Sequence, residues 1–472
     1  MNYLSSEQIN SIFTKQRDYV PLLKKSHPKE RIEKLIRIST WINNLQNQRK
    51  IINAIYADMK RPEVEIIGGE ITTIGIAIKM LSKNLKNWLK PKRVSTPISL
   101  FGYRSYIHYE PKGSSLIISP WNYPFQLAIT PLLYAIAGGN TAIIKPSEFT
   151  PHTSQLLEEM IGEIFEDKEV KVIQGGIPET TTLLDLPFNH IYFTGSPAVG
   201  KIIMKAAAKN LASVTLELGG KSPCIIDDGA NIKNAAENIA WGKYYNASQT
   251  CIAPDYLLVH HRIKDEFLNK FIQVLKDRYG STKEQIKNNK NIGRIVSDRH
   301  YTRAKSLLDD AISHGAKLLF GGVVDDENRF FSPTLLEETT PSMKVNNEEI
   351  FCPILPIFTF QNKEDVVEKI NSLPKPLSMY IFSSTHQNID YYIDHTSAGT
   401  TMVNNTLLQY ANENLPFGGI NNSGIGKSHG IHGLLEFMNE RSIMTQFFNS
   451  TRLLQPPYSD KTKKILNLLS KL

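Results

Sequence analysis

The stretch SSLIISPWNYPFQLAITPLLYAIAGGNTAIIKPSE, residues 114–148, contains two short apolar runs on either side of one longer apolar segment. The runs at residues 116–119 and 142–145 have the length of buried strands, whereas residues 126–137 have the length of a helix. A strand, a helix and a second strand in this order are typical of a βαβ unit with parallel strands. The stretch therefore predicts a parallel, doubly wound sheet.

The same alternation continues along the chain and indicates two α/β domains. Residues 1–88 have the apolar spacing of helices, and residues 90–110 mix Pro, Ser and aromatic residues as an exposed hairpin does. A second alternating series begins after Gly220. Further strands are expected at residues 170–174, 190–195, 214–218, 256–261, 353–360, 379–383, 399–404 and 441–447.

Composition restricts the functions that remain open. The chain has 472 residues, and its net charge of +8 is spread along the sequence, which argues against nucleic-acid binding and suits an anionic cofactor. Three cysteines, Cys224, Cys251 and Cys352, build neither a disulfide framework nor a CxxC pair, so a reducing compartment is favoured. We expect a cytoplasmic protein without an integral membrane segment, because neither a secretory signal nor an apolar run of about 18 residues is present. The histidines show no metal-site spacing, so no metal is expected.

A glycine-rich turn, GSPAVG at residues 195–200, directly follows the strand-like run HIYFT and precedes a helical pattern. Free backbone N–H groups and the helix dipole make such a turn a phosphate site. With Lys201 the turn also matches the start of a Walker A loop, but Ile202 stands where that loop needs Ser or Thr. A plain turn and a phosphate site both fit the glycines alone.

The segment SQTCIAPDY, residues 248–256, places Cys251 just after the helical pattern AAENIAWGKYYNAS. A nucleophilic cysteine must be accessible and at least partly thiolate, and helix ends and loops meet these needs better than cores do. A lone cysteine is more often a packing residue. Cys251 alone therefore leaves both interpretations open.

Six motifs in a fixed order decide between these interpretations. They are PWNYPF (120–125), IIKPSE (143–148), FTGSPAVG (193–200), LELGGK (216–221), QTC (249–251) and EEIF (348–351). With them the sequence resembles the aldehyde dehydrogenase superfamily over about residues 30–450. The run LPFGGINNSGIG at residues 415–426 and the text CIAPDY look most like the branch of fatty and aromatic aldehyde enzymes.

The resemblance implies oxidation of an aldehyde to the acid, with hydride transfer to NAD(P), through a thiohemiacetal and a thioester. Cys251 looks like the nucleophile, and Asn122 with the Cys251 backbone N–H would receive the oxyanion. Glu217 resembles the general base that activates the hydrolytic water. Taken singly, Asn122 also fits a turn residue and Glu217 a solvated carboxylate. The substrate implied is a medium or long aliphatic, or an aromatic, aldehyde.

The resemblance also implies a cofactor site that favours NAD, with NADP possible. Lys145 and Glu148 resemble the ribose-binding pair, and the Glu148 carboxylate would repel a 2′-phosphate. Glu349 and Phe351 stand two apart, so on an extended segment they would share a face toward the nicotinamide. Cys352 departs from the glycine usual in the family. The predicted cofactor-binding residues are Trp121, Lys145, Glu148, Gly195, Ser196, Gly200, Glu349 and Phe351.

The implied architecture is an α/β enzyme in three parts. Residues 1–88 and 109–217 form a Rossmann-like cofactor domain, and residues 218–428 form a second doubly wound catalytic domain. Residues 89–108 and 429–472 form a small β oligomerisation element with a C-terminal tail, in a homodimer. In the tail, Ile465, Leu466, Leu468, Leu469 and Leu472 give a short apolar helix face, which we expect to pack on the partner subunit.

Three alternatives remain on the residues alone. A cysteine-dependent thioesterase or amidase without nucleotide would leave Lys145, Glu148 and the Gly195 turn unexplained. A non-catalytic binding protein would be expected to have lost Cys251 or Glu217. A nucleotide-hydrolysing P-loop protein needs the complete Walker A loop.

Overall fold

The segment 114–148 forms a strand–helix–strand unit in the computed structural model, which describes residues 3–449 and 455–470. Strands β3 (Ser114–Ile118) and β4 (Thr141–Lys145) are parallel, and helix α6 (Gln126–Gly138) joins them. Both strands are fully buried along their length, as expected for a parallel sheet covered on both faces. The predicted βαβ unit is therefore confirmed.

Six strands form the first sheet. In spatial order they are β17 (Gly424–Ile425), β7 (Ser213–Glu217), β6 (His190–Thr194), β3, β4 and β5 (Val170–Val172). All neighbours are parallel except β17, which runs antiparallel to β7. The chain builds outward from β3 in one direction through β4 and β5, and then in the other through β6 and β7. The loops after β3 and β6 therefore border the switch point, where doubly wound sheets bind ligands.

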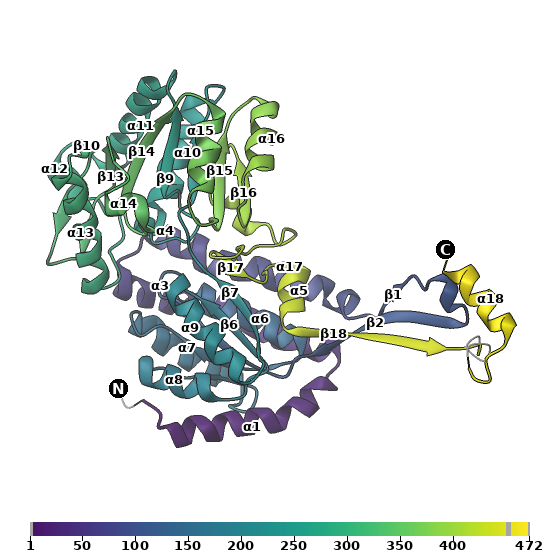
Figure 1. Ribbon diagram of the computed structural model, residues 1–472. Coiled ribbons are helices and arrows are strands. Elements are labelled where there is room, and N and C mark those ends of the chain that lie inside the picture. Colours follow the sequence, from purple (N-terminus) through teal and green to yellow (C-terminus); the bar gives the residue numbers. More distant parts are fainter. Residues whose placement is uncertain (1–2, 450–454, 471–472) are drawn as a thin grey trace.

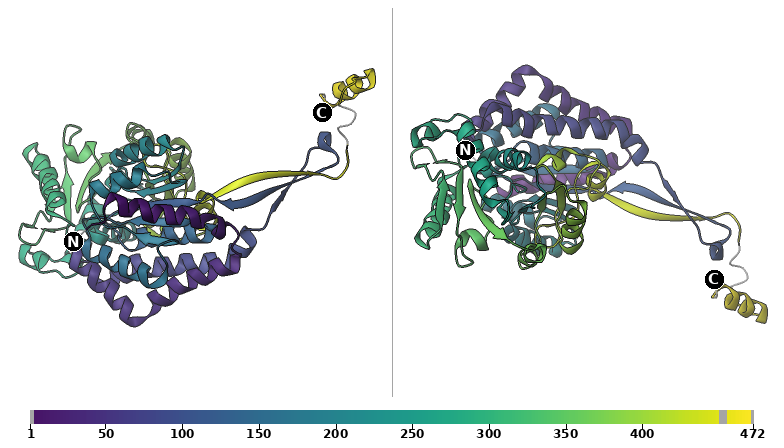
Figure 2. Two further views of the ribbon diagram at one scale, coloured as in Figure 1. Left: turned by 90° about the horizontal axis from the view of Figure 1, so that it is seen from below. Right: turned by 90° about the horizontal axis from the view of Figure 1, so that it is seen from above.

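Helices cover both faces of this sheet (Figures 1 and 2). On one face the core is shared by α2, α3, α5, α6 and α7, whereas α1, α8 and α9 pack on the other. The helical prediction for residues 1–88 is confirmed. These elements are α1 (Ser6–Lys24), α2 (Pro28–Asn43), α3 (Leu45–Met59), α4 (Glu63–Ile66), the π-helical turn η1 (Ile67–Thr72), α5 (Thr73–Trp88), α7 (Pro151–Ile164), α8 (Ile177–Asp185) and α9 (Pro197–Lys209).

Seven strands form the second sheet, above the first in Figure 1. In spatial order they are β10 (Lys317–Phe320), β13 (Thr334–Glu337), β14 (Ile354–Phe360), β9 (Tyr256–His260), β8 (Pro223–Ile226), β15 (Ser378–Phe382) and β16 (Thr400–Val403). Only β10 runs antiparallel to its neighbour. Its helices are α10 (Ile232–Tyr244), α11 (Lys264–Tyr279), α12 (Lys283–Lys287), α13 (Asp298–Ser313), α14 (Lys344–Asn347), α15 (Lys363–Asn371) and α16 (His386–His395). Strands β8, β10 and β13 were not predicted from the sequence.

A long β ribbon projects from the body in every view (Figures 1 and 2). Strand β2 (Tyr103–Pro111) pairs with β1 (Lys92–Val94) on one edge and with β18 (Met438–Gln446) on the other, both antiparallel. This confirms the predicted hairpin and C-terminal strand. Helix α18 (Asp460–Leu469) lies at the far end of the ribbon. Lys471 and Leu472, which belong to the predicted tail helix, lie outside the described residues. No helix within residues 3–449 and 455–470 is long and apolar enough to cross a membrane.

Candidate active site

The motifs converge where the two sheets face each other. Strand β7 ends at Glu217, and the chain passes through LGGKS directly into β8, at the start of the second sheet. Cys251 lies between α10 and β9, and Glu349 lies just before β14, so both precede strands of that sheet. The carboxyl edge of the first sheet therefore meets the amino edge of the second, and the site lies between them.

Cys251 is reached through a left-handed turn. Helix α10 ends at Tyr244, and then Asn246, Ala247 and Ser248 all have positive φ, at 52°, 49° and 65°. The prediction of a helix through Ser248 is therefore wrong. Positive φ costs on the order of 1–3 kcal/mol for a residue other than glycine and persists only where surrounding contacts fix it. The contacts of this turn are consequently part of how Cys251 is positioned.

The loop after β3 supplies several of these contacts. Asn122 is 4% exposed, and its Nδ2 donates to the Gln249 carbonyl at 3.0 Å. The Asn246 Nδ2 donates to the Asn122 carbonyl at 2.8 Å, and a hydroxyl pair joins Tyr123 and Thr250 at 2.7 Å. The structure therefore brings Asn122 and the Cys251 segment together, although Asn122 follows a strand of the first sheet and Cys251 precedes a strand of the second.

Two carboxylates, those of Glu349 and Glu217, contribute to the pKa of the Cys251 thiol. Burial raises the pKa of the partly buried Cys251 thiol to about 12, with further contributions from Glu349 and Glu217. Burial therefore opposes the thiolate character that a position at a helix end or in a loop favours. Burial also raises the pKa of Glu217 well above its ordinary value, although the Lys427 ammonium and the Ser428 hydroxyl oppose that rise, and both of its carboxylate oxygens are buried. A carboxylate whose pKa is raised is a stronger base, which suits it to take a proton from water or a thiol.

The EEIF segment turns rather than extending. Phe351 has φ 50°, and its ring packs edge-on against Trp121 with centroids 5.4 Å apart. The Glu349 carboxylate instead lies over Gly219, where a Cβ would come within 2.3 Å of its oxygen. Each side chain therefore has its own neighbour, and a shared face toward the nicotinamide stays a prediction. The positive φ falls on Phe351 and not on Cys352, so the backbone needs no glycine at position 352.

A buried ion pair, missed in the sequence, holds this segment. Lys221 pairs with Asp255, and the Lys221 Nζ also donates to the carbonyls of Val345 and Glu348 at 2.8 and 2.9 Å. The Ile350 N–H donates to Asp255 at 2.8 Å. Lys221 ends the LELGGK motif and Asp255 stands in CIAPDY, so the motifs contained the signal. The sequence did not show that both residues hydrogen-bond to the backbone of the EEIF segment.

Six of the predicted cofactor residues, all except Glu349 and Phe351, lie at or just beyond the carboxyl ends of strands β3, β4 and β6 of the first sheet. Lys145, at the end of β4, is 3% exposed, with its Nζ 3.6 Å from the Glu148 carboxylate, which is 40% exposed. Ser196 is the N-cap of α9, and its Oγ accepts the Val199 N–H at 3.4 Å. A Cβ on Gly200 would come within 2.9 Å of the Leu218 side chain, so glycine allows close helix–strand packing there.

These groups fit an anionic dinucleotide. The N-terminus of α9 provides free N–H groups and a positive dipole for phosphates. An exposed carboxylate beside a buried ammonium provides an acceptor and a donor for ribose hydroxyls. Gly195 and Ser196 follow β6, whereas Trp121 and Asn122 follow β3, so both groups stand at the switch point of the sheet.

Comparison with known proteins gives the family. A model described as "Aldehyde dehydrogenase family" matches residues 1–443. The 4,4'-diaponeurosporen-aldehyde dehydrogenase of Staphylococcus aureus is 45% identical over 439 residues, covering 92% of this chain and 93% of that protein. The dimeric NADP-preferring aldehyde dehydrogenase of Rattus norvegicus is 39% identical over 416 residues, covering 88% of this chain and 90% of that protein.

A solved structure, the substrate-bound state of Staphylococcus aureus AldH, has 42% identity and a TM-score of 0.91, and the match covers 99% of this chain and 100% of that one. Sequence and fold therefore agree over almost the whole length, and known members of the family include an NADP-preferring enzyme and one solved with NAD+. The chain belongs to the aldehyde dehydrogenase family and is an NAD(P)-dependent aldehyde dehydrogenase.

Proposed function

We propose that the chain oxidises an apolar aldehyde to its acid through a thioester on Cys251. The observation that carries this proposal is the convergence of Cys251, the Asn122 amide and the buried Glu217 carboxylate between the two sheets. A nucleophile, an oxyanion donor and a base are the three groups that such chemistry requires.

The steps follow from these groups. The Cys251 thiol gives its proton to Glu217, and the sulfur forms a bond to the aldehyde carbon. The Asn122 Nδ2 and the Cys251 backbone N–H stabilise the oxyanion that develops on the carbonyl oxygen. NAD(P)+, when held by the cofactor residues named below, would supply the hydride acceptor that the collapse of the tetrahedral intermediate to the thioester requires. Glu217, once its proton has passed to solvent, takes a proton from the attacking water, and the acid leaves as the Cys251 thiol is restored.

Cofactor roles extend the same proposal. Lys145 and Glu148 would bind the adenosine ribose, and Gly195, Ser196 and Gly200 would shape the phosphate turn before α9. Glu349 would hold the nicotinamide ribose, while Trp121 and Phe351, whose rings touch, would support the ring. Glu148 favours NAD over NADP, because its charge opposes a 2′-phosphate. The domain division follows, with residues 1–88 and 109–217 as the cofactor domain and 218–428 as the catalytic domain.

An apolar substrate is supported by the surroundings of Cys251. An apolar cluster built on Ile252, Leu377, Leu407 and Phe417 packs against Cys251, together with Trp241, Tyr245 and Tyr410. Tyr244, by contrast, lies in the core of the second sheet against Tyr279. We therefore propose medium or long aliphatic, or aromatic, aldehydes as the substrate class.

We also propose that the chain acts as a homodimer through the ribbon and its end. Phe101, Phe447 and Phe448 are each more than half exposed in the single chain. Exposed aromatic side chains gathered at one place are typical of protein interfaces.

Replacement of Cys251 by Ala tests the nucleophile. We expect Cys251→Ala to lose aldehyde oxidation while NAD binding, followed by fluorescence, stays unchanged, because the thiol forms the covalent intermediate and holds no cofactor. Steady-state rates of the unmodified enzyme over a series of aldehyde chain lengths test the substrate class. Substantial NAD-dependent turnover by Cys251→Ala, or a preference for short polar aldehydes, would contradict the proposal.

A further inference from the structure

Arg61 is a completely buried arginine close to the loop that follows β3 and the turn before Cys251. Arg61 follows α3 and is 0% exposed. Its Nη1 is 2.9 Å from the Glu70 carboxylate, its Nε is 3.7 Å from the Glu65 carboxylate, and its Nη2 donates to the Glu65 carbonyl at 3.2 Å. The guanidinium carbon also lies 4.3 Å from the centre of the Tyr123 ring and 5.4 Å from that of Tyr245.

The two carboxylates that pair with Arg61 each bind the backbone of one segment of the candidate active site. The Glu70 Oε2 accepts the N–H groups of Phe125 at 3.2 Å and Gln126 at 2.8 Å, where the loop bearing Asn122 enters α6. The Glu65 Oε2 accepts the Asn246 N–H at 2.9 Å, at the first left-handed residue before Cys251. One guanidinium therefore links two carboxylates, one bound to the oxyanion loop and the other to the nucleophile turn.

The local backbone is shaped around this arginine. Gly69 lies in the π-helical turn η1, and a Cβ there would come within 2.6 Å of the Arg61 Nη2 and 3.1 Å of the Tyr123 ring. The π-helix is rare, and its single turns within α-helices are frequent at functional sites. Burial raises the pKa of both Glu65 and Glu70 to about 7, and Arg61 opposes that rise. Without Arg61, the two carboxylates would lose their compensating charge.

We propose that Arg61, with Glu65 and Glu70, is a positioning residue that sets the distance between the Asn122 amide and the Cys251 sulfur. The role rests on the proposed function, because it acts through Asn122 and Cys251 and touches neither substrate nor cofactor. Rotation or displacement of either loop by about 1 Å would misalign the oxyanion donor, and such displacements can cost on the order of a hundredfold in rate.

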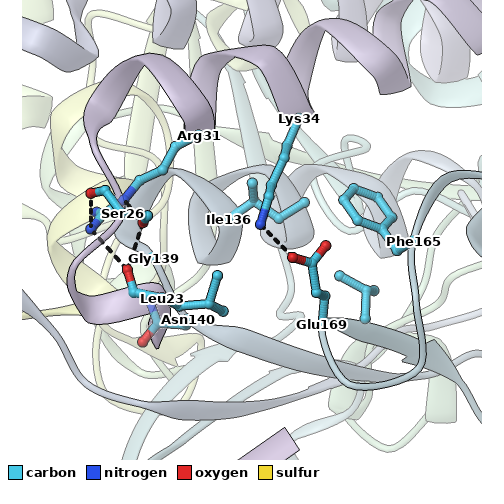
Figure 3. Close-up of a pocket in the computed structure, with 10 residues that line it drawn as sticks. Leu23, Ser26, Arg31, Lys34, Ile136, Gly139, Asn140, Phe165 and Glu169 are labelled. Carbon is cyan, nitrogen blue, oxygen red and sulfur yellow. Dashed lines mark hydrogen bonds and ion pairs between the residues drawn. The ribbon is translucent and has the colours of Figure 1, made fainter. Parts of the chain in front are cut away.

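The test compares Arg61→Met with Arg31→Met, because both remove a buried arginine next to α6. Arg31 is 6% exposed and lies in a small pocket at the other end of that helix, near Lys34 and Glu169 (Figure 3). It donates to the Ala137 carbonyl at 3.2 Å and to the Ser26 Oγ at 2.9 Å, and none of its hydrogen bonds among the described residues reaches an active-site loop. Arg31→Met therefore controls for the loss of a buried charge in the same layer of the fold.

Four quantities are measured for both variants: the melting temperature, kcat/KM for an aldehyde, the Kd for NAD, and the rate at which iodoacetamide alkylates Cys251. We expect Arg61→Met to lose roughly 30- to 100-fold in kcat/KM, mainly in kcat, and to change the alkylation rate, with the NAD Kd within about twofold. Arg31→Met should lower the melting temperature but keep kcat/KM within about threefold. The loss of kcat/KM in Arg61→Lys should lie between the losses in Arg61→Met and Arg31→Met, because lysine keeps the positive charge but lacks the planar guanidinium.

The proposal is overturned if folded Arg61→Met keeps kcat/KM within about threefold of the unmodified enzyme, or if Arg31→Met loses as much as Arg61→Met. If Arg61→Met does not fold, the variants Arg61→Lys and Glu65→Gln test the positioning role instead. Each should lose about fivefold or more in kcat at an unchanged NAD Kd, and two folded variants with unaltered kcat overturn the role. A fully active Cys251→Ala would show that the proposed function itself fails. An inactive Cys251→Ala beside a fully active Arg61→Met would show that only the positioning role fails.

Discussion

Replacement of Glu148 by Gln should shift the cofactor preference from NAD toward NADP. Glu148 follows β4 at the predicted ribose site, its side chain is 40% exposed, and its carboxylate lies 3.6 Å from the Lys145 Nζ. Glutamine has almost the same shape and can still accept a hydroxyl, but it carries no charge. The substitution therefore isolates the electrostatic contribution to selectivity.

The size of the shift follows from Coulomb's law. If Glu148 accepts the ribose hydroxyls, a 2′-phosphate would stand roughly 5 Å from the carboxylate. At an effective dielectric constant of about 40–80, suited to a partly exposed group, each unit charge is repelled by about 0.8–1.7 kcal/mol. A phosphate of about −1.5 to −2 charge is then opposed by roughly 1.5–3 kcal/mol, which is about ten- to a hundredfold in affinity. The NADP Kd should fall by that factor, and the NAD Kd should rise about fivefold, because a charge-assisted hydrogen bond becomes a neutral one.

Fluorescence titration with both cofactors measures these affinities. Glu159→Gln is the matched control, because it makes the same charge change on the exposed side of α7. Its NAD and NADP affinities should change equally, if at all. Added salt should reduce the Glu148→Gln effect through screening. Equal NAD and NADP affinities in the unmodified chain, or an unchanged ratio in Glu148→Gln, would show that this carboxylate does not face the 2′ position.

Two further predictions concern the base and the tail. Glu217→Gln should slow thioester hydrolysis by about 10²–10⁴-fold, so that acyl-enzyme accumulates and appears in intact mass spectra. Burial raises the pKa of Glu217, and only the ionised carboxylate accepts a proton. The deacylation rate of the unmodified enzyme should therefore increase as pH rises through that raised pKa, and the Gln variant should lose this pH dependence. Impaired hydride transfer without an acyl adduct would contradict the role of Glu217 as the base. Truncation after Pro457 removes α18, whose Leu466 and Leu468 are 47% and 68% exposed in the single chain, and it should weaken the dimer in sedimentation velocity while activity needs no membrane. Strong sedimentation of the full chain with anionic vesicles at physiological salt, lost on truncation, would show that the tail binds lipid instead.

Regular elements and motif residues could be predicted from the sequence. Strands β3, β4 and β6 are short apolar runs followed by glycine-rich or proline-containing loops, and their parallel pairing follows from the helices between them. The sequence also identified Asn122, Cys251 and Glu217, which the structure brings to one place. Local patterns sufficed here because each element is defined by residues adjacent in the chain.

Turns held by distant groups could not be predicted. Nothing in YYNASQ indicates three consecutive left-handed residues, since none is glycine and the apolar spacing continues that of a helix. The turn persists because Glu65 and Asn122 bind it from other parts of the chain. Phe351 is similar, because its left-handed backbone lies in a segment that Lys221 and Asp255 hold through contacts to Val345, Glu348 and Ile350.

The buried ion pairs explain why these turns have a single geometry. Burial of a charged pair costs several kcal/mol per ion, and well-packed apolar residues of similar volume are often at least as stabilising. Arg61–Glu70 and Lys221–Asp255 are both almost fully buried. Glu70 accepts the Gln126 N–H after the loop that carries Asn122, and Lys221 donates to the Glu348 carbonyl beside Glu349. Apolar side chains in these places could fill the same volume, but they could not direct individual N–H and C=O groups. The charges therefore contribute more to the placement of the two loops than to the stability of the fold, and this is the property that the comparison of Arg61→Met with Arg31→Met measures.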